Sequence, residues 1–405
     1  QRGGVAASEE MAVMAARPAR VQLAPSAYPQ TEIWGYDGQM PGPAIRLKQG
    51  ERVARRFVNE LPQASSVHWH GLRIDNAMDG VAGLTQDAVE PGNSFDYDFV
   101  APDAGTFWFH AHNRSFEQVA RGLYGALIVE EPVAADVDRD EVLILDDWLL
   151  DPKTAQIDPE FEAPHDRSHA GRRGNYIATN GRSGFTLPVK RNERLRLRLI
   201  NAANARIFEL GLAGLKGWVM AYDGMPLAKP ELVEGAFLLS PGERVDLFVD
   251  VVAESGDMAH LVRIDDQQQY SQTTFTVAGD AAATPRADPA PLPPNLNMEI
   301  EDVETARRFR LNMEGGAMGG LNAAELNGER NSFRQLAQAN QFWAFNGAVG
   351  MTDAPLARLS RRETARLELY NDTSFPHAMH LHGMHFRELL KDGSVGPLRD
   401  QVLIV

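Results

Sequence analysis

The histidines of this chain are concentrated in three short segments. Eight of the eleven histidines lie in these segments, and each segment contains a His-x-His pair. The members are His68 and His70, His110 and His112, and the run His377, His380, His382 and His385. At this histidine frequency, chance would give roughly 0.3 His-x-His pairs over the whole chain. The clustering therefore indicates a shared chemical task, and metal binding is the first hypothesis to consider.

A spacing of two residues places both imidazoles on one side of a β-strand. Residues i and i+2 of a strand project from the same face, roughly 7 Å apart, whereas on a helix they diverge. Each pair can therefore offer two ligands to one metal, or one ligand to each of two neighbouring metals. All-imidazole ligation suits copper, zinc or iron, but a structural zinc site needs only four ligands. A lone buried histidine is more often a satisfied core residue, but clustered imidazoles favour a multinuclear site, for which copper fits best.

An internal repeat organises the chain into three copies of one unit. Each copy has an Asp-Gly or Asn-Gly turn, a short strand, a charged turn and a second strand with alternating side chains. The first strands are expected at residues 44–47, 185–187 and 356–359, and the second strands end at residues 57–59, 199–201 and 369–371. After a Pro-Gly turn the alternation recurs at residues 95–99 and 245–249. These short strands and turns predict an all-β chain of tandem β-sandwiches.

The repeat also divides the chain into domains. The predicted domains cover residues 1–132, 133–285 and 286–405, with a linker rich in Ala, Pro and Asp at residues 281–294. Histidine pairs occur in the first and third copies, whereas the middle copy has Ile207-Phe208-Glu209-Leu210 at the corresponding place. If the pairs were needed for folding, all three copies should contain them. The pattern therefore predicts one site between the first and third domains, with the middle domain as a spacer.

Length and charge exclude some classes of function. At 405 residues the chain is too long for one compact core. Its formal net charge of -15 argues against a nucleic-acid partner. No apolar run approaches the roughly 20 residues that span a bilayer, so no membrane partner is expected. The chain has no cysteine, so thiols give no information about its redox compartment. We expect a monomer.

Three segments resemble three of the four copper-binding motifs of the three-domain multicopper oxidases. They are His68-Trp69-His70-Gly71, Trp108-Phe109-His110-Ala111-His112 and His377-Ala378-Met379-His380-Leu381-His382-Gly383. Gly122-Leu123-Tyr124-Gly125-Ala126 and Pro241-Gly242-Glu243 match further family positions, so the resemblance runs from about Thr31 to the end. It implies three tandem cupredoxin-like Greek-key β-sandwich domains, the third of them incomplete, and an oxidoreductase of the laccase type.

The resemblance implies a role for each histidine of the motifs. In relatives the corresponding residues bind a type 2 copper, a binuclear type 3 pair and a type 1 copper. The implied ligands are His68 and His380 for type 2, His70, His110, His112 and His382 for type 3, and His377 for type 1. His385 lies where relatives use no ligand. The histidines outside the motifs, expected at the surface, are His165, His169 and His260.

Asp79 has two interpretations. It matches an acidic residue that helps to deliver protons to the copper cluster in relatives, which would make it catalytic. The sequence Asp79-Gly80 is equally well explained as a tight turn.

The fourth motif of the family, a His-Cys-His segment with the type 1 cysteine, has no counterpart in this chain. The chain stops at residues 399–405, and the equivalent stretch of the first copy, Gln86-Asp87-Ala88-Val89, continues to about Val129. By this comparison the third domain lacks roughly 40 residues. We therefore expect the sequence to be incomplete. The alternative is a natural form without type 1 copper.

The implied reaction couples one-electron oxidation of a small-molecule reductant or a metal ion to the reduction of dioxygen to water. Phenols and aromatic amines would make the enzyme a laccase, and Cu(I) would make it a metallo-oxidase. Scattered methionines are more often packing than soft Cu(I) ligands, and those to consider are Met298, Met313, Met318 and Met351. The alternatives are a copper storage or tolerance protein and a non-catalytic cupredoxin-repeat protein. A periplasmic or secreted location is expected, although no leader is visible.

Overall fold

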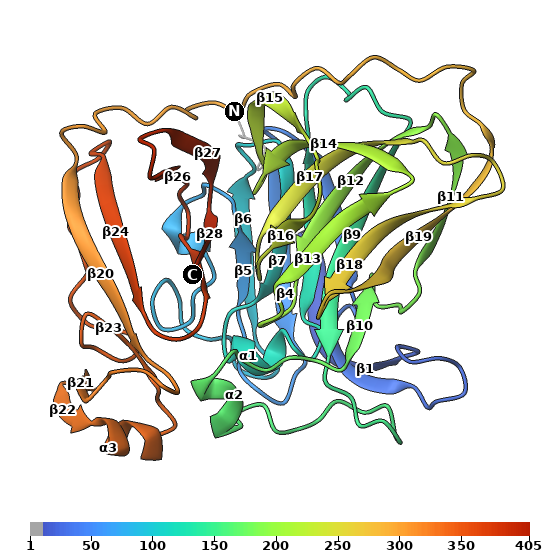
Figure 1. Cartoon of the computed structure of the whole chain (residues 1–405). Helices are drawn as coiled ribbons and strands as arrows, with labels where there is room; N and C mark the ends of the chain where they lie inside the picture. The colour runs from blue at the N-terminus through green and yellow to red at the C-terminus, as the bar shows by residue number, and fades with distance from the viewer. Residues whose placement is uncertain (1–10) are drawn as a thin grey trace, which may run out of the picture.

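The computed structural model describes residues 11–405, which form an almost wholly β structure (Figure 1). The all-β prediction is confirmed. The helices are short and consist of α1 (Ser115–Gln118), α2 (Pro164–Ser168), α3 (Phe333–Gln338) and the 3-10 turn η1 (Asn76–Met78). Among the described residues, no helix has the length and apolarity needed to cross a membrane.

The first β-sandwich has two four-stranded sheets, with the strand orders β2-β1-β4-β6 and β3-β8-β7-β5. Its strands are β1 (Ala12–Val21), β2 (Thr31–Tyr36), β3 (Gly42–Lys48), β4 (Arg52–Asn59), β5 (Val67–His70), β6 (Ser94–Val100), β7 (Gly105–Ala111) and β8 (Tyr124–Glu130). Its core is rich in aromatic side chains, and Phe57, Trp69, Tyr97 and Phe107 are fully buried there. Strand β5 is the edge strand of its sheet.

The second β-sandwich has a six-stranded sheet, β10-β9-β12-β17-β14-β15, and a five-stranded sheet, β11-β19-β18-β13-β16. Its strands are β9 (Arg139–Trp148), β10 (Tyr176–Thr179), β11 (Thr186–Arg191), β12 (Arg194–Asn201), β13 (Phe208–Ala213), β14 (Leu215–Tyr222), β15 (Met225–Leu232), β16 (Phe237–Leu239), β17 (Arg244–Val251), β18 (Met258–Asp265) and β19 (Gln268–Asp280).

Strand β12 shows how alternation builds this second sandwich. Its leucines, Leu195, Leu197 and Leu199, are fully buried in the hydrophobic core. Its arginines point to the opposite face and are buried as well, because each pairs with a carboxylate. The pairs are Arg194–Asp250, Arg196–Asp246 and Arg198–Asp140. Arg198 also donates to Oγ1 of Thr106 on β7 at 3.0 Å, so this polar face contacts the first sandwich.

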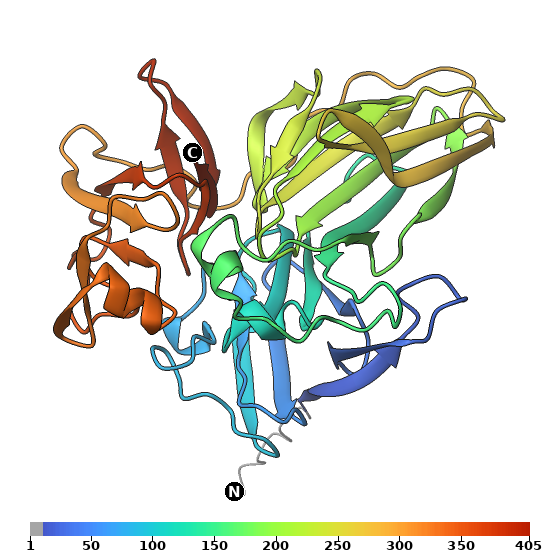
Figure 2. The ribbon, with the colours of Figure 1, turned by 60° about the horizontal axis from the view of Figure 1, so that its bottom comes forward.

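Residues 281–306 run from the second sandwich to the third part of the chain, along the top of Figure 1. The third part has small sheets with the orders β23-β20-β24, β21-β22, β25-β28 and β26-β27. Its strands are β20 (Arg307–Gly315), β21 (Ala323–Leu326), β22 (Glu329–Ser332), β23 (Trp343–Phe345), β24 (Ala365–Asp372), β25 (His377–His380), β26 (Phe386–Leu389), β27 (Val395–Arg399) and β28 (Gln401–Ile404). Strands β25 to β28, dark red in Figure 2, lie on the side that faces the two sandwiches.

Most of the strands that the repeat predicts are present in the structure, but one is absent. Residues 44–47 lie in β3 and residues 369–371 lie in β24. The prediction of a strand at residues 356–359 is wrong, because these residues have no strand conformation. In the other two copies this strand pairs in parallel with a late strand of its own sandwich, β3 with β8 and β11 with β19. Residues 356–359 have no such partner among the described residues, and an unpaired segment lacks the hydrogen bonds that define a strand.

Candidate metal centre

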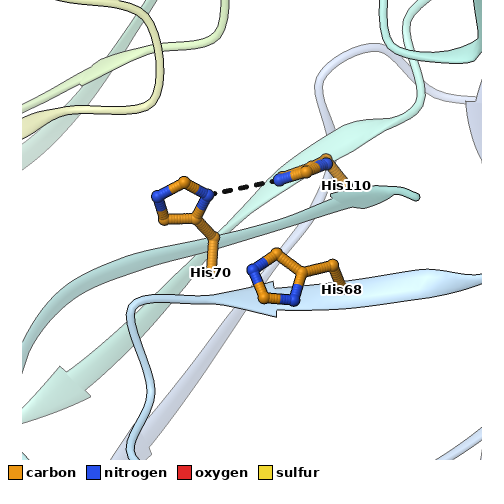
Figure 3. A group of neighbouring side chains, drawn as sticks. All are labelled: His68, His70 and His110. Atoms are coloured by element: carbon orange, nitrogen blue, oxygen red, sulfur yellow. Dashed lines mark hydrogen bonds between the residues drawn. The ribbon is translucent and has the colours of Figure 1, made fainter. Parts of the chain in front are cut away.

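Strands β5 and β7 place their histidines on one side of the sheet. The two strands pair antiparallel, with His68 opposite His110 and His70 opposite Trp108. Trp69, between the two histidines of β5, is fully buried in the core of the first sandwich. Because side chains alternate along a strand, the core position of Trp69 holds His68 and His70 on the other side (Figure 3).

The third part of the chain brings two more imidazoles to this side. His380 lies on β25, and its Nε2 is 3.4 Å from Nε2 of His68. His382 follows that strand, and its ring centroid is 5.0 Å from the ring centroid of His112, which follows β7.

Besides the pairs His68–His380 and His112–His382, a third pair lies within the first sandwich. There Nδ1 of His70 is 3.3 Å from Nε2 of His110 (Figure 3). The six imidazoles predicted for the type 2 and type 3 sites thus approach one another as three pairs. Ligand atoms of His68, His70 and His110, and those of His68, His380 and His382, each lie within 4.8 Å of one another.

Hydrogen bonds from Nδ1 of His68 and of His380 to backbone oxygens fix which ring nitrogen of each histidine faces the other histidine. Nδ1 of His68 lies 2.8 Å from the backbone oxygen of Asp79, and Nδ1 of His380 lies 3.0 Å from the backbone oxygen of Asp400. A carbonyl oxygen only accepts, so in both rings Nδ1 has the proton and Nε2 presents a lone pair. These two lone pairs face each other across 3.4 Å and repel, unless a cation lies between them. The arrangement is that of a metal site rather than of a hydrogen-bonded pair.

Asp79 contacts two of the six imidazoles. Its Oδ2 accepts a hydrogen bond of 2.8 Å from Nδ1 of His382, and its Oδ1 lies 3.3 Å from Nδ1 of His68. Gly80 follows with a φ of +75°, and a Cβ at this position would lie 1.7 Å from the backbone oxygen of Val67. A glycine is therefore required for the chain to turn this close to β5. The tight turn and the contact with the cluster are both present, because the turn is what brings the carboxylate to the imidazoles.

Burial keeps the four imidazoles of the first sandwich neutral. It lowers the pKa of His68 to about 3 and the pKa of His112 to about 4. The pKa values of His70 and His110 are also lowered well below their usual value, chiefly by burial. Burial raises the pKa of Asp79, but hydrogen bonds from His382 and His68 outweigh it and hold that pKa below its usual range. At neutral pH these four imidazoles are therefore uncharged and lie near an ionised carboxylate, as a bound metal cation requires.

His377 lies apart from the three pairs. It is on β25, its Nε2 is 2.9 Å from Oγ1 of Thr373, and its ring packs edge-on against Trp343. Beside it is a cavity of about 600 Å³, lined by residues from all three parts of the chain. The lining includes His70, His110, Phe116, Phe161, Trp343 and His377. His377 thus borders the same cavity as three cluster histidines, His70, His110 and His380, without joining their pairs.

The remaining histidines differ in exposure. The side chain of His165 is 79 % exposed, which agrees with the surface position predicted for it, and His169 stacks against its ring. His260 lies in β18 and is hydrogen-bonded to Ser271 through Nδ1. His385 is buried, with 2 % of its side chain exposed, and its Nε2 lies 3.5 Å from Oδ2 of Asp400.

Asp400 is a residue of the site that the sequence analysis missed. Its carboxylate is fully buried, and Oδ1 lies 3.4 Å from Nε2 of His70 and 3.2 Å from Nδ1 of His380. Neither the repeat nor any of the histidine motifs gives a signal for Asp400.

Acid should destabilise the metal-free protein through these histidines. The pKa of His112 is about 4 in the folded chain against a usual value of 6.5, so the unfolded chain takes up the proton first as the pH falls. Between these two values the free energy of unfolding should therefore fall with pH, by up to about 1.4 kcal/mol per pH unit for each such histidine. A His112→Gln variant should show a flatter dependence in urea unfolding with a chelator present.

The His165→Gln variant is the control for this measurement, because that side chain is exposed. It should keep the slope of the unchanged protein. Equal slopes for the unchanged protein and for H112Q would contradict the buried, neutral state of His112.

Comparison with known proteins identifies the family. Models of multicopper oxidase domains match residues 19–134, 139–279 and 327–401. The crystal structure of Lac15, from a marine microbial metagenome, superposes with a TM-score of 0.78. It is 38% identical, with 98% of this chain and 90% of that chain covered. The multicopper oxidase MmcO of Mycobacterium tuberculosis is 29% identical over 97% of this chain and 79% of its own.

Copper resistance protein A of Escherichia coli is 30% identical over 72% of this chain and 54% of its own, so this chain spans about half the length of that relative. Its name, like that of MmcO, refers to copper. The three domain matches and the similarity to Lac15 cover the segments that form the sandwiches and the histidine pairs. The chain therefore belongs to the multicopper oxidases, copper-dependent oxidoreductases built from cupredoxin-like domains.

Proposed function

We propose that the three imidazole pairs hold a trinuclear copper cluster at which dioxygen is reduced to water. In this proposal His68 and His380 hold the type 2 copper. The type 3 coppers are held by His70, His110, His112 and His382. The observation that supports it most directly is the His68–His380 pair, whose Nε2 lone pairs face each other at 3.4 Å.

The residues present fit copper. Two imidazole nitrogens bound to one ion, each at about 2.0 Å, lie roughly 3 Å apart, which is close to the 3.4 Å and 3.3 Å in two of the pairs. Imidazole suits copper, and metal-bound histidines usually donate their other ring N–H to a carboxylate or a carbonyl. His68, His380 and His382 have such acceptors in this structure. Bound copper would supply the redox chemistry, by accepting single electrons and transferring them to dioxygen.

A type 1 copper does not fit the residues of this chain. Such a site needs a cysteine thiolate, and the chain has no cysteine. His377 is the single residue that the resemblance gives to it, and Nε2 of His377 is already within hydrogen-bond distance of Thr373. The type 1 site therefore cannot be assembled from these residues, and neither can the type 3 ligands that the resemblance assigns to the two histidines of the His-Cys-His motif.

Asp79 is proposed to position the cluster and to transfer protons to it. Its Oδ2 holds Nδ1 of His382, which aims the opposite nitrogen of that ring at the cluster. The hydrogen bonds that lower its pKa also keep the carboxylate ionised at neutral pH. The other oxygen, Oδ1, accepts no hydrogen bond within ordinary geometry, so it can accept a proton and pass it toward dioxygen.

The proposed reductant is a phenol or an aromatic amine, with a metal ion as the second candidate. The cavity beside His377 is lined by the rings of Phe116, Phe161 and Trp343, against which an aromatic molecule can pack. A methionine site for Cu(I) would need its thioethers together. Met313 is 1 % exposed, however, whereas Met318 and Met351 are 80 % and 67 % exposed, so these residues lie in different environments.

We also propose that the protein is a monomer and acts in the periplasm or outside the cell, as the family resemblance implies. Cell fractionation and analytical ultracentrifugation of the full-length protein test the two points. A cytoplasmic protein or a stable dimer would contradict them.

Removing one ligand should abolish oxygen reduction without unfolding the chain. In the full-length protein, His70→Ala or His112→Ala should reduce oxygen uptake with a phenolic reductant to background, because a metal ligand contributes little to the core. Circular dichroism and copper per chain are measured on the same samples, with His260→Ala as the control. Undiminished uptake in the folded variants would refute the ligand assignment. Copper retained by the unchanged protein without uptake from phenols, aromatic amines or Cu(I) would favour copper storage.

Replacing Asp79 by Asn should lower kcat, because an amide of the same size cannot take up the proton. Loss of acid–base assistance typically costs about 10²- to 10⁴-fold in rate. Oxygen uptake at saturating reductant is compared with copper per chain, which should change far less. Asp87→Asn, at an exposed position, should leave kcat unchanged. A normal kcat in D79N would leave the tight turn as the only role of Asp79.

A further inference from the structure

The carboxylate of Asp400 is enclosed by one arginine and three imidazoles. It lies between β27 and β28 and is fully buried. Its distances to the ring nitrogens are 3.4 Å to His70 Nε2, 3.2 Å to His380 Nδ1 and 3.5 Å to His385 Nε2. A buried carboxylate needs a charged partner, and none of these imidazoles is bonded as closely as Arg244.

Arg244 comes from the second sandwich, where it begins β17, and it is fully buried as well. Its Nη1 and Nη2 donate to the two oxygens of Asp400 at 3.0 Å and 2.7 Å, a two-pronged contact that fixes the plane of the carboxylate. Its Nε donates to the backbone oxygen of Thr106 on β7. Arg244 therefore joins all three parts of the chain at one point.

The chain next to His70 leaves room for this ion pair. Gly71 has a φ of +93°, and a Cβ there would lie 2.0 Å from Nη2 of Arg244 and 2.8 Å from Oδ2 of Asp400. No side chain fits between the ion pair and the end of β5. The pair thus lies directly behind the imidazole of His70.

Asp400 faces opposite nitrogens in two cluster histidines. It faces Nε2 of His70, whose Nδ1 is 3.3 Å from His110, and Nδ1 of His380, whose Nε2 is 3.4 Å from His68. A carboxylate only accepts, so it favours the proton on the nitrogen that it faces. The same group therefore favours the Nε2–H form of His70 and the Nδ1–H form of His380.

Which ring nitrogen of His70 has the proton decides whether the His70–His110 pair can bind a metal. Nδ1 of His110 lies 3.0 Å from the backbone oxygen of Ala111, so Nε2 of His110 presents a lone pair. In the Nδ1–H form, His70 would donate to that lone pair, and the hydrogen bond would occupy both metal-binding nitrogens. In the Nε2–H form, two lone pairs face each other, as in the His68–His380 pair.

We propose that Asp400, held by Arg244 of the second domain, is a positioning residue that sets the Nε2–H form of His70 and thereby keeps the His70–His110 pair open for copper. The inference rests on the proposed function for the role of copper. The form of His70 in the metal-free protein does not depend on it. Asp79 contacts His68 and His382 in a similar way, so two aspartates from different domains contact four of the six imidazoles through their backbone or side-chain oxygens.

His380 is an internal reference for the test. Its Nδ1 also donates to the backbone oxygen of Asp400, at 3.0 Å, and this acceptor remains whatever the side chain is. Nε2 of His70 is buried and has no hydrogen-bond partner within ordinary geometry, so the charge of Asp400 at 3.4 Å is what favours a proton there. Changing the side chain of Asp400 should therefore alter His70 and leave His380 as it was.

The test measures the protonated ring nitrogen of each histidine in metal-free, full-length protein by long-range ¹H–¹⁵N NMR, with His70→Gln and His380→Gln spectra for assignment. In Asp400→Asn the ratio of the Nε2–H to the Nδ1–H form of His70 should fall about fivefold, because a neutral acceptor replaces a charged one. The ratio for His380 should not change. Copper binding should weaken about 10- to 100-fold, as is usual when such an outer partner is lost.

Asp250→Asn is the matched control. Asp250 lies toward the far end of the same strand β17 and makes an equally buried two-pronged pair with Arg194. If D400N and D250N give the same form of His70 and the same copper affinity, the proposal is overturned. If D400N does not fold, Arg244→Lys, which keeps the charge but loses the two-pronged contact, decides by the same readouts against Arg194→Lys. If the protein without substitutions binds no copper, the proposed function is refuted. The ratio of the two protonated forms of His70 measured by NMR would still test the role of Asp400.

Discussion

The metal centre depends on the alternation of side chains along β5. Trp69 is fully buried and packs within about 6 Å, centroid to centroid, of the rings of Tyr97, Phe99 and Phe109. Its neighbours His68 and His70 must then project to the other side. A slip of one residue in the pairing of β5 with β7 would move the tryptophan into the site and the imidazoles into the core. The core of the first sandwich thus fixes the position of the ligands before any metal binds.

The second domain contributes no imidazole, but it is more than a spacer. Its buried arginines on β12 pair with carboxylates of the same domain, but Arg196 also pairs with Glu131 and Arg198 contacts β7 through Thr106. Arg244 of the second domain also forms a buried ion pair with Asp400 of the third part. Removing one partner of a buried ion pair leaves an uncompensated charge, which is far more costly than the pair itself is stabilising. These contacts therefore tie the relative position of the first and third parts to the second.

The features that could be predicted from the sequence are the local ones. Histidines two residues apart on strands, such as His68 and His70, share a face because of strand geometry, and a turn at Asp79-Gly80 follows from the residue types. The strand predicted at residues 356–359 failed, because a strand needs a partner that a local pattern cannot supply. The burial of His385 and the position of Asp400 were missed for a similar reason. Asp400 is paired with Arg244, which lies more than 140 residues earlier in the chain and in another domain, and His385 lies against Asp400.

X-ray diffraction at the copper absorption edge, from crystals of the copper-loaded full-length protein, tests most directly whether the three pairs form one copper centre. Anomalous density should appear between His68 and His380, between His70 and His110, and beside His112 and His382. Density confined to an exposed histidine such as His165, with none between His68 and His380, would contradict the account.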